Sequence, residues 1–145
     1  MNSSLFSLEN QIVLITGSSR GLGWSMAKAV AEAGATVLLH GRDVNLLKER
    51  KQHLKELGQK AEYYIFDVAN DEEVLAAFGK IREQHGKLDG LVNNAAGNFV
   101  CPSKDLTYNG WNSILDIVLK GTMDLTLQLG KRMIQEQSPG VFANI

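Results

Sequence analysis

The stretch "ITGSSRGLG", residues 15–23, decides the fold that this chain can adopt. Its three glycines and three small hydroxyl side chains follow an apolar run, residues 12–15, that is typical of a buried strand. Glycine lets backbone amides approach a ligand closely, and the first turn of a helix offers free N–H groups at the positive end of its dipole. The stretch therefore predicts a phosphate-binding turn between a strand and a helix. A turn that only packs the strand against its helix is the alternative.

Short apolar runs alternate with longer helical patterns along the rest of the chain. Strands are expected at residues 11–16, 35–40, 61–66, 87–94 and 140–145, and helices at residues 22–33, 44–57, 71–84 and 108–137. Gly34, Gly58, Gly86 and Gly140 fall where these helices should end, as left-handed cap residues. Strands separated by such helices imply right-handed crossovers and a parallel sheet covered on both faces. The pattern predicts a doubly wound α/β fold.

Length and composition restrict the kinds of partner that the chain can have. With 145 residues and 44% hydrophobic content, the chain can form one domain with a sizeable core. The formal net charge is -1 and the basic residues are dispersed, which argues against nucleic acid and membrane surfaces as partners. The first ten residues have neither a basic region nor an unbroken apolar run, so we expect a cytoplasmic protein without a membrane span.

Histidine and cysteine residues give no sign of a metal site. His40, His53 and His85 fall in different predicted elements and have no partner at metal-ligand spacing, so no metal is expected. Cys101 is the only cysteine, so it cannot form an internal disulfide. It has no adjacent base, and such a thiol is usually a small hydrophobic side chain.

The glycine spacing G-x-x-x-G-x-G, together with "NNAAG" at residues 93–97, resembles the short-chain dehydrogenase/reductase family. The resemblance extends over residues 8–145. It rests on motifs in the family's order, which are residues 16–23, Asp67 with Val68, residues 91–97 and "GVFANI" at residues 140–145. The family implies a Rossmann-type doubly wound parallel sheet with strand order 3-2-1-4-5, incomplete on its C-terminal side.

The resemblance also implies which residues bind a dinucleotide. The pyrophosphate would lie on the glycine turn formed by Gly17, Ser19, Arg20, Gly21, Leu22 and Gly23. The adenine would lie between Asp67 and Val68, although Asp67 could instead be a turn or capping acid ahead of the next helix. The residues after the fourth strand that would line the cofactor are Asn93, Asn94, Ala95 and Gly97.

Charged residues after the second strand favour NADP over NAD. An acid about 20 residues after the last glycine typically binds the ribose hydroxyls of NAD, and this count reaches Asp43. Aligned by strand end, however, the acid of the family's NAD enzymes corresponds to Gly41, and Arg42 follows. A guanidinium can form paired charged hydrogen bonds with a 2′-phosphate, and Arg20 matches a second basic position of NADP-using members. We expect NADP, with Asp43 opening the following helix.

The residues that carry out hydride transfer in this family are not found here. Members usually use a Tyr-x-x-x-Lys pair, in which lysine lowers the pKa of the tyrosine, together with an upstream serine. Tyr63, Tyr64 and Tyr108 are not followed by lysine at that spacing. We therefore assign no catalytic residue and expect a cofactor-binding part, residues 1–145, that ends before the catalytic segment and is inactive alone. A non-catalytic dinucleotide-binding or partner-binding module ending naturally at residue 145 is the alternative.

Two branches of the family resemble different parts of the chain. "NNAAGNF" and "DIVLKGT", where Val118 replaces the family's helix asparagine, resemble 2,4-dienoyl-CoA reductases. "TGSSRGLG" and "TVLLHGRD" resemble gluconate 5-dehydrogenases. The resemblance implies a small-molecule substrate and a homo-oligomer, dimer or tetramer. A helical apolar stripe favours core or subunit contact, and it consists of Leu115, Val118, Leu119, Thr122 and Met123.

Overall fold

A computed structural model describes residues 3–97 and 100–145. Asn98 and Phe99, the last two residues of the "NNAAGNF" motif, lie outside the described residues. The strands are β1 (Ile12–Ile15), β2 (Thr36–His40), β3 (Ala61–Tyr64), β4 (Gly90–Asn93) and β5 (Val141–Asn144). All pairings are parallel, and the strand order is β3-β2-β1-β4-β5, which confirms the order expected from the sequence.

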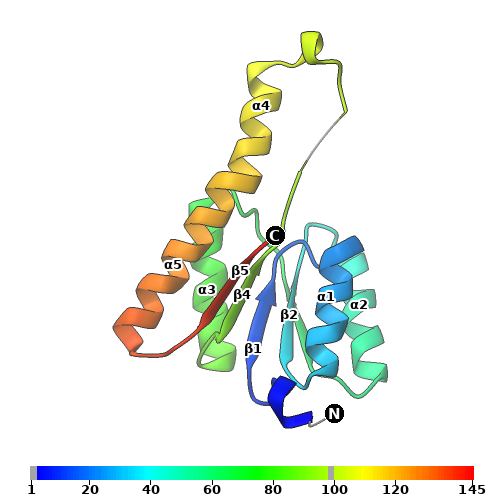
Figure 1. Ribbon diagram of the computed structural model, residues 1–145, viewed down its shortest axis with the longest axis vertical. Helices are drawn as coiled ribbons and strands as arrows, with labels where there is room; N and C mark the ends of the chain where they lie inside the picture. Colours follow the sequence, from blue (N-terminus) through cyan, green and yellow to red (C-terminus); the bar gives the residue numbers. More distant parts are fainter. Residues whose placement is uncertain (1–2, 98–99) are drawn as a thin grey trace.

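Helices cover both faces of this sheet, as a doubly wound fold requires (Figure 1). The α-helices are α1 (Gly21–Glu32), α2 (Val44–Glu56), α3 (Asp71–His85), α4 (Tyr108–Leu115) and α5 (Gly121–Glu136). Short 3-10 turns lie at η1 (Ser3–Phe6) and η2 (Ser103–Asp105). Helices α1 and α2 lie on one face, and α3 and α5 lie on the other. None of the helices within the described residues has the length and apolar character needed to cross a membrane.

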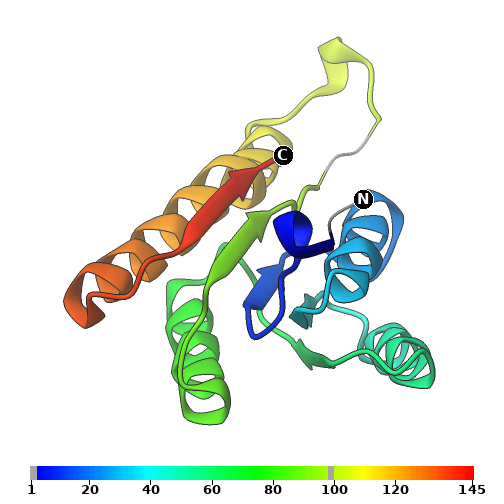
Figure 2. The same ribbon diagram turned by 60° about the horizontal axis from the view of Figure 1, so that its bottom comes forward.

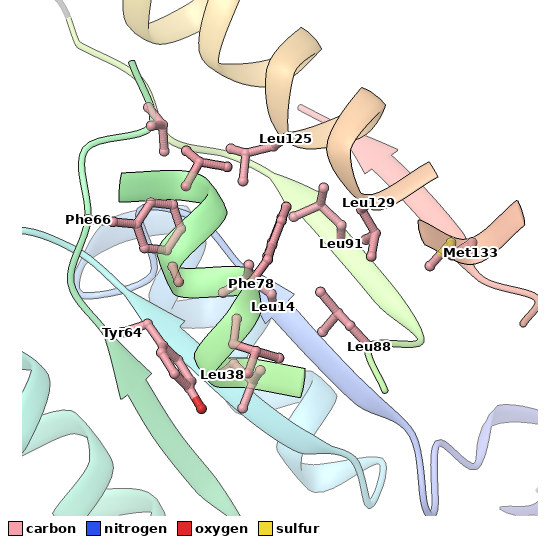
Figure 3. Close-up of a cluster of buried hydrophobic side chains, with 14 residues drawn as sticks. Leu14, Leu38, Tyr64, Phe66, Phe78, Leu88, Leu91, Leu125, Leu129 and Met133 are labelled. Atoms are coloured by element: carbon pink, nitrogen blue, oxygen red, sulfur yellow. The ribbon is translucent and has the colours of Figure 1, made fainter. Parts of the chain in front are cut away.

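The side chains of the central strands divide between two cores. Leu14 and Leu38 point to the α3 and α5 face, where they join the cluster drawn in Figure 3 with Phe78, Leu125 and Leu129. Their neighbours along the strands belong to the opposite cluster, which contains Val13, Ile15, Val37, Leu39, Ala27, Ala31, Leu47 and Leu54. Successive strand residues face opposite sides, so a strand covered on both faces must be apolar at every position. This requirement explains the continuous apolar runs of β1 and β2.

The single helix predicted over residues 108–137 is interrupted. A π-helical turn, η3 (Asp116–Lys120), separates α4 from α5, and α4 projects beyond the sheet (Figure 1). Figure 2 shows α5 lying alongside β5. The face that α5 buries consists of Gly121, Leu125, Leu129 and Met133, at intervals of one turn. Leu119 and Met123 of the predicted apolar stripe are 63% and 58% exposed, so they do not contribute to the core of the described chain.

Glycine ends three of the helices as predicted, but not the last one. Gly34, Gly58 and Gly86 have positive φ angles at or just after the ends of α1, α2 and α3. The prediction for Gly140 is wrong, because α5 ends earlier and Gln137 adopts the left-handed conformation with φ 50°. Gly140 instead lies in close contact, since a Cβ atom there would overlap with the Met133 side chain.

Leu125 and Leu127 provide a matched test of how α5 packs. Leu125 is 1% exposed in the core and Leu127 is 46% exposed on the same helix. Leu125→Ala should lower the free energy of unfolding by about 2–5 kcal/mol, because it removes buried methyl groups and leaves a cavity. Leu127→Ala should change it by less than about 1 kcal/mol. Urea denaturation measures both, and equal losses would contradict this packing.

Candidate functional site

A cleft of about 750 Å³ lies at the carboxyl edge of the sheet. Ligands of open α/β sheets bind at this edge, because the loops after parallel strands meet there. The cleft is lined by Gly17, Ser19, Arg20, His40, Gly41, Arg42, Asp43, Phe66, Asp67, Val68, Asn94, Ala95, Ala96, Gly97 and Ile117. These residues follow β1, β2, β3 and β4, apart from His40, which ends β2, and Ile117 on the π-helical turn. The chain thus gathers loop residues from four strands around one space.

The three glycines of the turn after β1 have different structural requirements. Gly17 has a φ of 64°, and a Cβ atom there would come within 3.1 Å of the Ala95 backbone. Gly23 lies against Gly17, since a Cβ atom there would overlap with the carbonyl oxygen of Gly17. Gly21 has a φ of 56°, but a Cβ atom at Gly21 would meet no atom within 4 Å. Glycines around a pyrophosphate have these three roles, because one forms a tight turn, one allows the helix to pack closely on the strand, and one leaves the backbone open to the ligand.

The first turn of α1 has the features of an anion site. The N-cap residue is Arg20, and its side chain makes no capping hydrogen bond within the described chain. The amide of Trp24 donates to the carbonyl of Arg20 at 3.2 Å, so the amides of Gly21, Leu22 and Gly23 precede the first bond of the helix. Unpaired amides at the positive end of a helix dipole favour phosphate.

His40, the last residue of β2, connects three loops of the cleft. The amide of Gly17 donates to its Nδ1 at 3.0 Å, and its Nε2 lies 2.9 Å from the carbonyl oxygen of Phe66. The amide of Ser18 also donates to the His40 carbonyl, and the amide of His40 donates to Ser18 Oγ. Burial lowers the pKa of His40, since only 4% of the residue is exposed. Both ring nitrogens are occupied by backbone groups.

Arg50 of α2 supports the same turn from the other side. Its Nε donates to the carbonyl of Ser19 at 3.1 Å, and its guanidinium lies over the Trp24 ring at 4.9 Å. The cation–π interaction restricts the long arginine side chain. Arg50 thereby fixes the carbonyl of Ser19, the residue before the N-cap of α1.

Thr16 and Asn94 join the ends of β1 and β4. The hydroxyl of Thr16 accepts hydrogen bonds from the amides of Asn94 and Ala95, both at 2.9 Å. The side-chain amide of Asn94 donates to the carbonyl of Thr16 at 3.0 Å and approaches that of Gly17 at 3.3 Å. Asn94 therefore lines the cleft while its side chain fixes the start of the glycine turn.

Asn93 lies on the other side of β4 and does not line the cleft. Its Nδ2 donates to Thr126 Oγ1 at 3.0 Å and to Asn144 Oδ1 at 2.9 Å. The side chain therefore connects β4 to α5 and β5. Of the two asparagines expected beside the cofactor, only Asn94 faces the cleft in the described chain.

Asp67 and Val68 form the part of the cleft after β3. The Asp67 carboxylate accepts from the amide of Ala69 at 2.9 Å, and the Asp67 amide donates to Glu73 Oε2 at 2.8 Å. The cap of α3 is Asn70, whose side chain accepts from Glu72 and Glu73, so Asp67 is a turn acid and not the helix cap. Val68 is buried against α5, because a Cβ atom at Gly121 would come within 2.9 Å of it.

The loop after β2 contains the residues that bear on cofactor choice. Arg20 and Arg42 are exposed and line the same cleft. A Cβ atom at Gly41 would come within 3.2 Å of Ser19 Oγ, so this position has little space for a larger side chain. Asp43 caps α2, as predicted, because its carboxylate accepts from the amide of Leu46 at 3.1 Å.

Most of the sequence-predicted site residues come together in this cleft. Those that line it are Gly17, Ser19, Arg20, Arg42, Asp67, Val68, Asn94, Ala95 and Gly97. Gly21, Leu22 and Gly23 begin α1 directly after Arg20 and are not part of the lining, and neither is Asn93. Val118 does not line the cleft, whereas its neighbour Ile117 does. Ile117 lies so close to Gly97 that a Cβ atom at Gly97 would come within 2.8 Å of it.

Two residues that shape the site, His40 and Arg50, were not predicted from the sequence. His40 was considered only as a metal ligand, but its partners are backbone groups 23 and 26 positions away. A histidine that ends an otherwise apolar buried strand was the available signal, because a buried imidazole must find hydrogen-bond partners. Arg50 resembles any solvated helix residue in the sequence, and no local signal distinguishes it.

Known proteins share this architecture and sequence. The family model for short chain dehydrogenases matches residues 11–145. A probable 2,4-dienoyl-CoA reductase of Bacillus subtilis is 36% identical over 138 residues, or 95% of this chain and 54% of the relative. A short chain dehydrogenase structure from Bacillus anthracis has a TM-score of 0.88 at 38% identity, covering 93% of this chain and 56% of that one.

A further solved structure is a gluconate 5-dehydrogenase from Burkholderia cenocepacia in complex with NADP and tartrate. Its TM-score is 0.90 at 28% identity, covering 99% of this chain and 56% of that chain. The chain thus spans about half the length of these relatives, 54–56%. The family match covers the glycine turn, the loops around the cleft and all five strands. The chain therefore belongs to the short-chain dehydrogenase family of oxidoreductases.

Proposed function

We propose that this chain is the cofactor-binding part of an NADP(H)-dependent oxidoreductase acting on a carbonyl, alcohol or enoyl-thioester substrate. The observation that carries the proposal is the cleft, which is lined by Gly17 of the glycine turn and by Arg20 and Arg42, with the open backbone of Gly21 directly after Arg20. When bound, the dinucleotide supplies or accepts the hydride, while the protein holds and orients it. The relatives described above include a 2,4-dienoyl-CoA reductase and a gluconate 5-dehydrogenase, and we assign neither substrate.

The residues around the cleft suit the parts of a dinucleotide. The pyrophosphate would lie on the first amides of α1, those of Gly21, Leu22 and Gly23, where no side chain fills the space beside Gly21. The adenine would lie along Val68, beside the Asp67 turn. Asn94, Ala95 and Gly97 would face the nicotinamide end, since they follow β4 on the far side of the turn. A site made of backbone amides and apolar walls is typical of nucleotide binding.

NADP is favoured over NAD by the loop after β2. Arg20 and Arg42 would bind the 2′-phosphate through charged hydrogen bonds. The position at which an acid would bind the ribose hydroxyls of NAD is Gly41, and a Cβ atom there would come within 3.2 Å of Ser19 Oγ. Two solved relatives carry NADP, a gluconate 5-dehydrogenase and a metagenomic short-chain oxidoreductase.

A dinucleotide-binding module without catalysis remains the second candidate, because it would use the same cleft. The two candidates differ in the chemistry that follows binding. An enzyme should oxidise NADPH in the presence of enoyl-thioester or carbonyl substrates and should carry a Tyr-x-x-x-Lys pair in its full natural chain. A binding module should do neither while still binding the cofactor.

We also propose that the protein is a homo-oligomer. Leu119 and Met123 leave an apolar strip of α5 and its preceding turn exposed, by 63% and 58%. Contiguous exposed apolar surface usually marks an interface. Light scattering of the full natural chain should give the mass of a dimer or tetramer, and a monomer at micromolar concentration would exclude this assembly.

Cofactor choice can be tested at Arg42. Arg42→Ala should weaken NADPH binding by about 1.5–3 kcal/mol, the usual contribution of a hydrogen bond to a charged group, and should leave NADH binding nearly unchanged. Lys48→Ala removes the same charge from an exposed position of α2 outside the cleft and should change neither affinity. Calorimetric titration measures all of these. A wild-type protein that binds NADH more tightly than NADPH would overturn the assignment.

The glycine turn can be tested with a pair of strained substitutions. Gly21 and Gly58 both have positive φ angles, 56° and 74°, and both have open space at the Cβ position. Valine at either site should cost similar stability, because a β-branched residue disfavours positive φ. Gly21→Val alone should abolish binding of both dinucleotides, since its side chain would enter the pyrophosphate space. Normal affinity in a folded Gly21→Val protein would show that the turn is only structural.

A further inference from the structure

The structure assigns a positioning role to His40: its neutral imidazole, protonated on Nε2, holds the glycine turn in the shape that binds the cofactor's phosphates. The inference rests on the proposed function, and it concerns how this chain builds the site. His40 itself belongs to β2, Gly17 follows β1, and Phe66 follows β3. One buried side chain therefore fixes the relative positions of three strand ends that border the cleft.

The hydrogen-bond partners allow only one tautomer. The amide of Gly17 can only donate, so Nδ1 must carry a lone pair. The carbonyl of Phe66 can only accept, so Nε2 must carry the proton. A doubly protonated ring would bring two N–H groups together at 3.0 Å. Burial, the largest effect, lowers the pKa of His40, and so does Arg42, whereas the hydrogen bond to Phe66 and the charge of Asp67 raise it; the net shift is downward.

The bonds to His40 divide the backbone amides of the turn into two groups, those that are bonded to His40 and those that are free for a ligand. Those of Gly17 and Ser18 are bonded to His40, through Nδ1 at 3.0 Å and the carbonyl oxygen at 2.9 Å. The amides at the beginning of α1 are left for a ligand. On the other side, the ring holds the carbonyl of Phe66, the residue before Asp67, and lies 4.2 Å from the Phe66 ring between centroids. His40 thus positions both the loop proposed to bind the phosphates and the loop proposed to bind the adenine.

Asparagine and leucine make a matched pair at this position. Both side chains have the same number of heavy atoms, and both lose the hydrogen bond to Phe66. Only asparagine keeps an acceptor for the Gly17 amide, because its Oδ1 is as many bonds from Cα as Nδ1 is in histidine. Calorimetric titration with NADP⁺ at about pH 8, above the ordinary histidine pKa, compares them in the full natural chain. His40→Asn should stay within roughly threefold of wild type, and His40→Leu should bind at least about tenfold more weakly, because the Gly17 amide loses its partner.

Two spectroscopic measurements test the role without the cofactor. Nitrogen NMR of the wild-type ring should show Nδ1 unprotonated and Nε2 protonated. Hydrogen exchange at the Gly17 amide should be slow in wild type and His40→Asn and much faster in His40→Leu. A protein whose fold was merely weakened would lose protection throughout β1 and β2 as well.

The outcomes separate this inference from the proposed function. A wild-type protein that binds neither NADP⁺ nor NAD⁺ overturns the proposed function, and the role of His40 in cofactor binding falls with it. A wild-type protein that binds NADP⁺ while His40→Leu binds equally well overturns only the inference. Should His40→Leu fail to fold, two other results would still overturn the inference. One is a wild-type His40 ring protonated on Nδ1, and the other is a His40→Asn protein that binds NADP⁺ as weakly as an unfolded control.

Discussion

The site depends on how the backbone amides just after β1 find hydrogen-bond partners. A strand that ends at a ligand cleft leaves polar groups that neither the sheet nor the next helix can satisfy, and buried groups of this kind are costly. Here Thr16 satisfies amides of the β4 loop and His40 satisfies those of Gly17 and Ser18. Because these partners come from neighbouring strands, the turn is fixed before any ligand arrives.

The fixed shape of the turn after β1 also explains why its three glycines have different structural requirements. Gly23 must lack a side chain because α1 crosses directly over the Gly17 carbonyl, and Gly17 must accept a positive φ beside Ala95. Gly21 is restricted by neither neighbour, and its open space faces away from the protein atoms. The positive φ of Gly21 favours glycine in any turn, as it does at Gly58. The open space beside Gly21 gives the first amides of α1 room for a ligand.

Periodicity predicted the strands and the helices, apart from the interruption at Asp116–Lys120, whereas the strand order and most cleft residues were implied by the resemblance to the family. What the sequence could not predict depends on partners far apart in the chain. Asn93 and Asn94 are adjacent, yet strand alternation turns Asn93 toward Thr126 and Asn144 and leaves Asn94 at the cleft. The π-helical turn at Asp116–Lys120 and the roles of His40 and Arg50 likewise arise from tertiary interactions.

We propose that NADP(H) occupies the cleft with its phosphates on the glycine turn and between the two arginines. A titration of the full natural chain with NADP⁺, followed by backbone amide NMR, tests it most directly. We expect the largest shift changes at the backbone amides of Gly21, Leu22, Arg42 and Val68. A second, smaller hollow of about 640 Å³ lies beside β3, where Lys51, Tyr63 and Lys80 are among the lining residues. Shift changes concentrated in that hollow, or none at saturating cofactor, would contradict binding in the cleft.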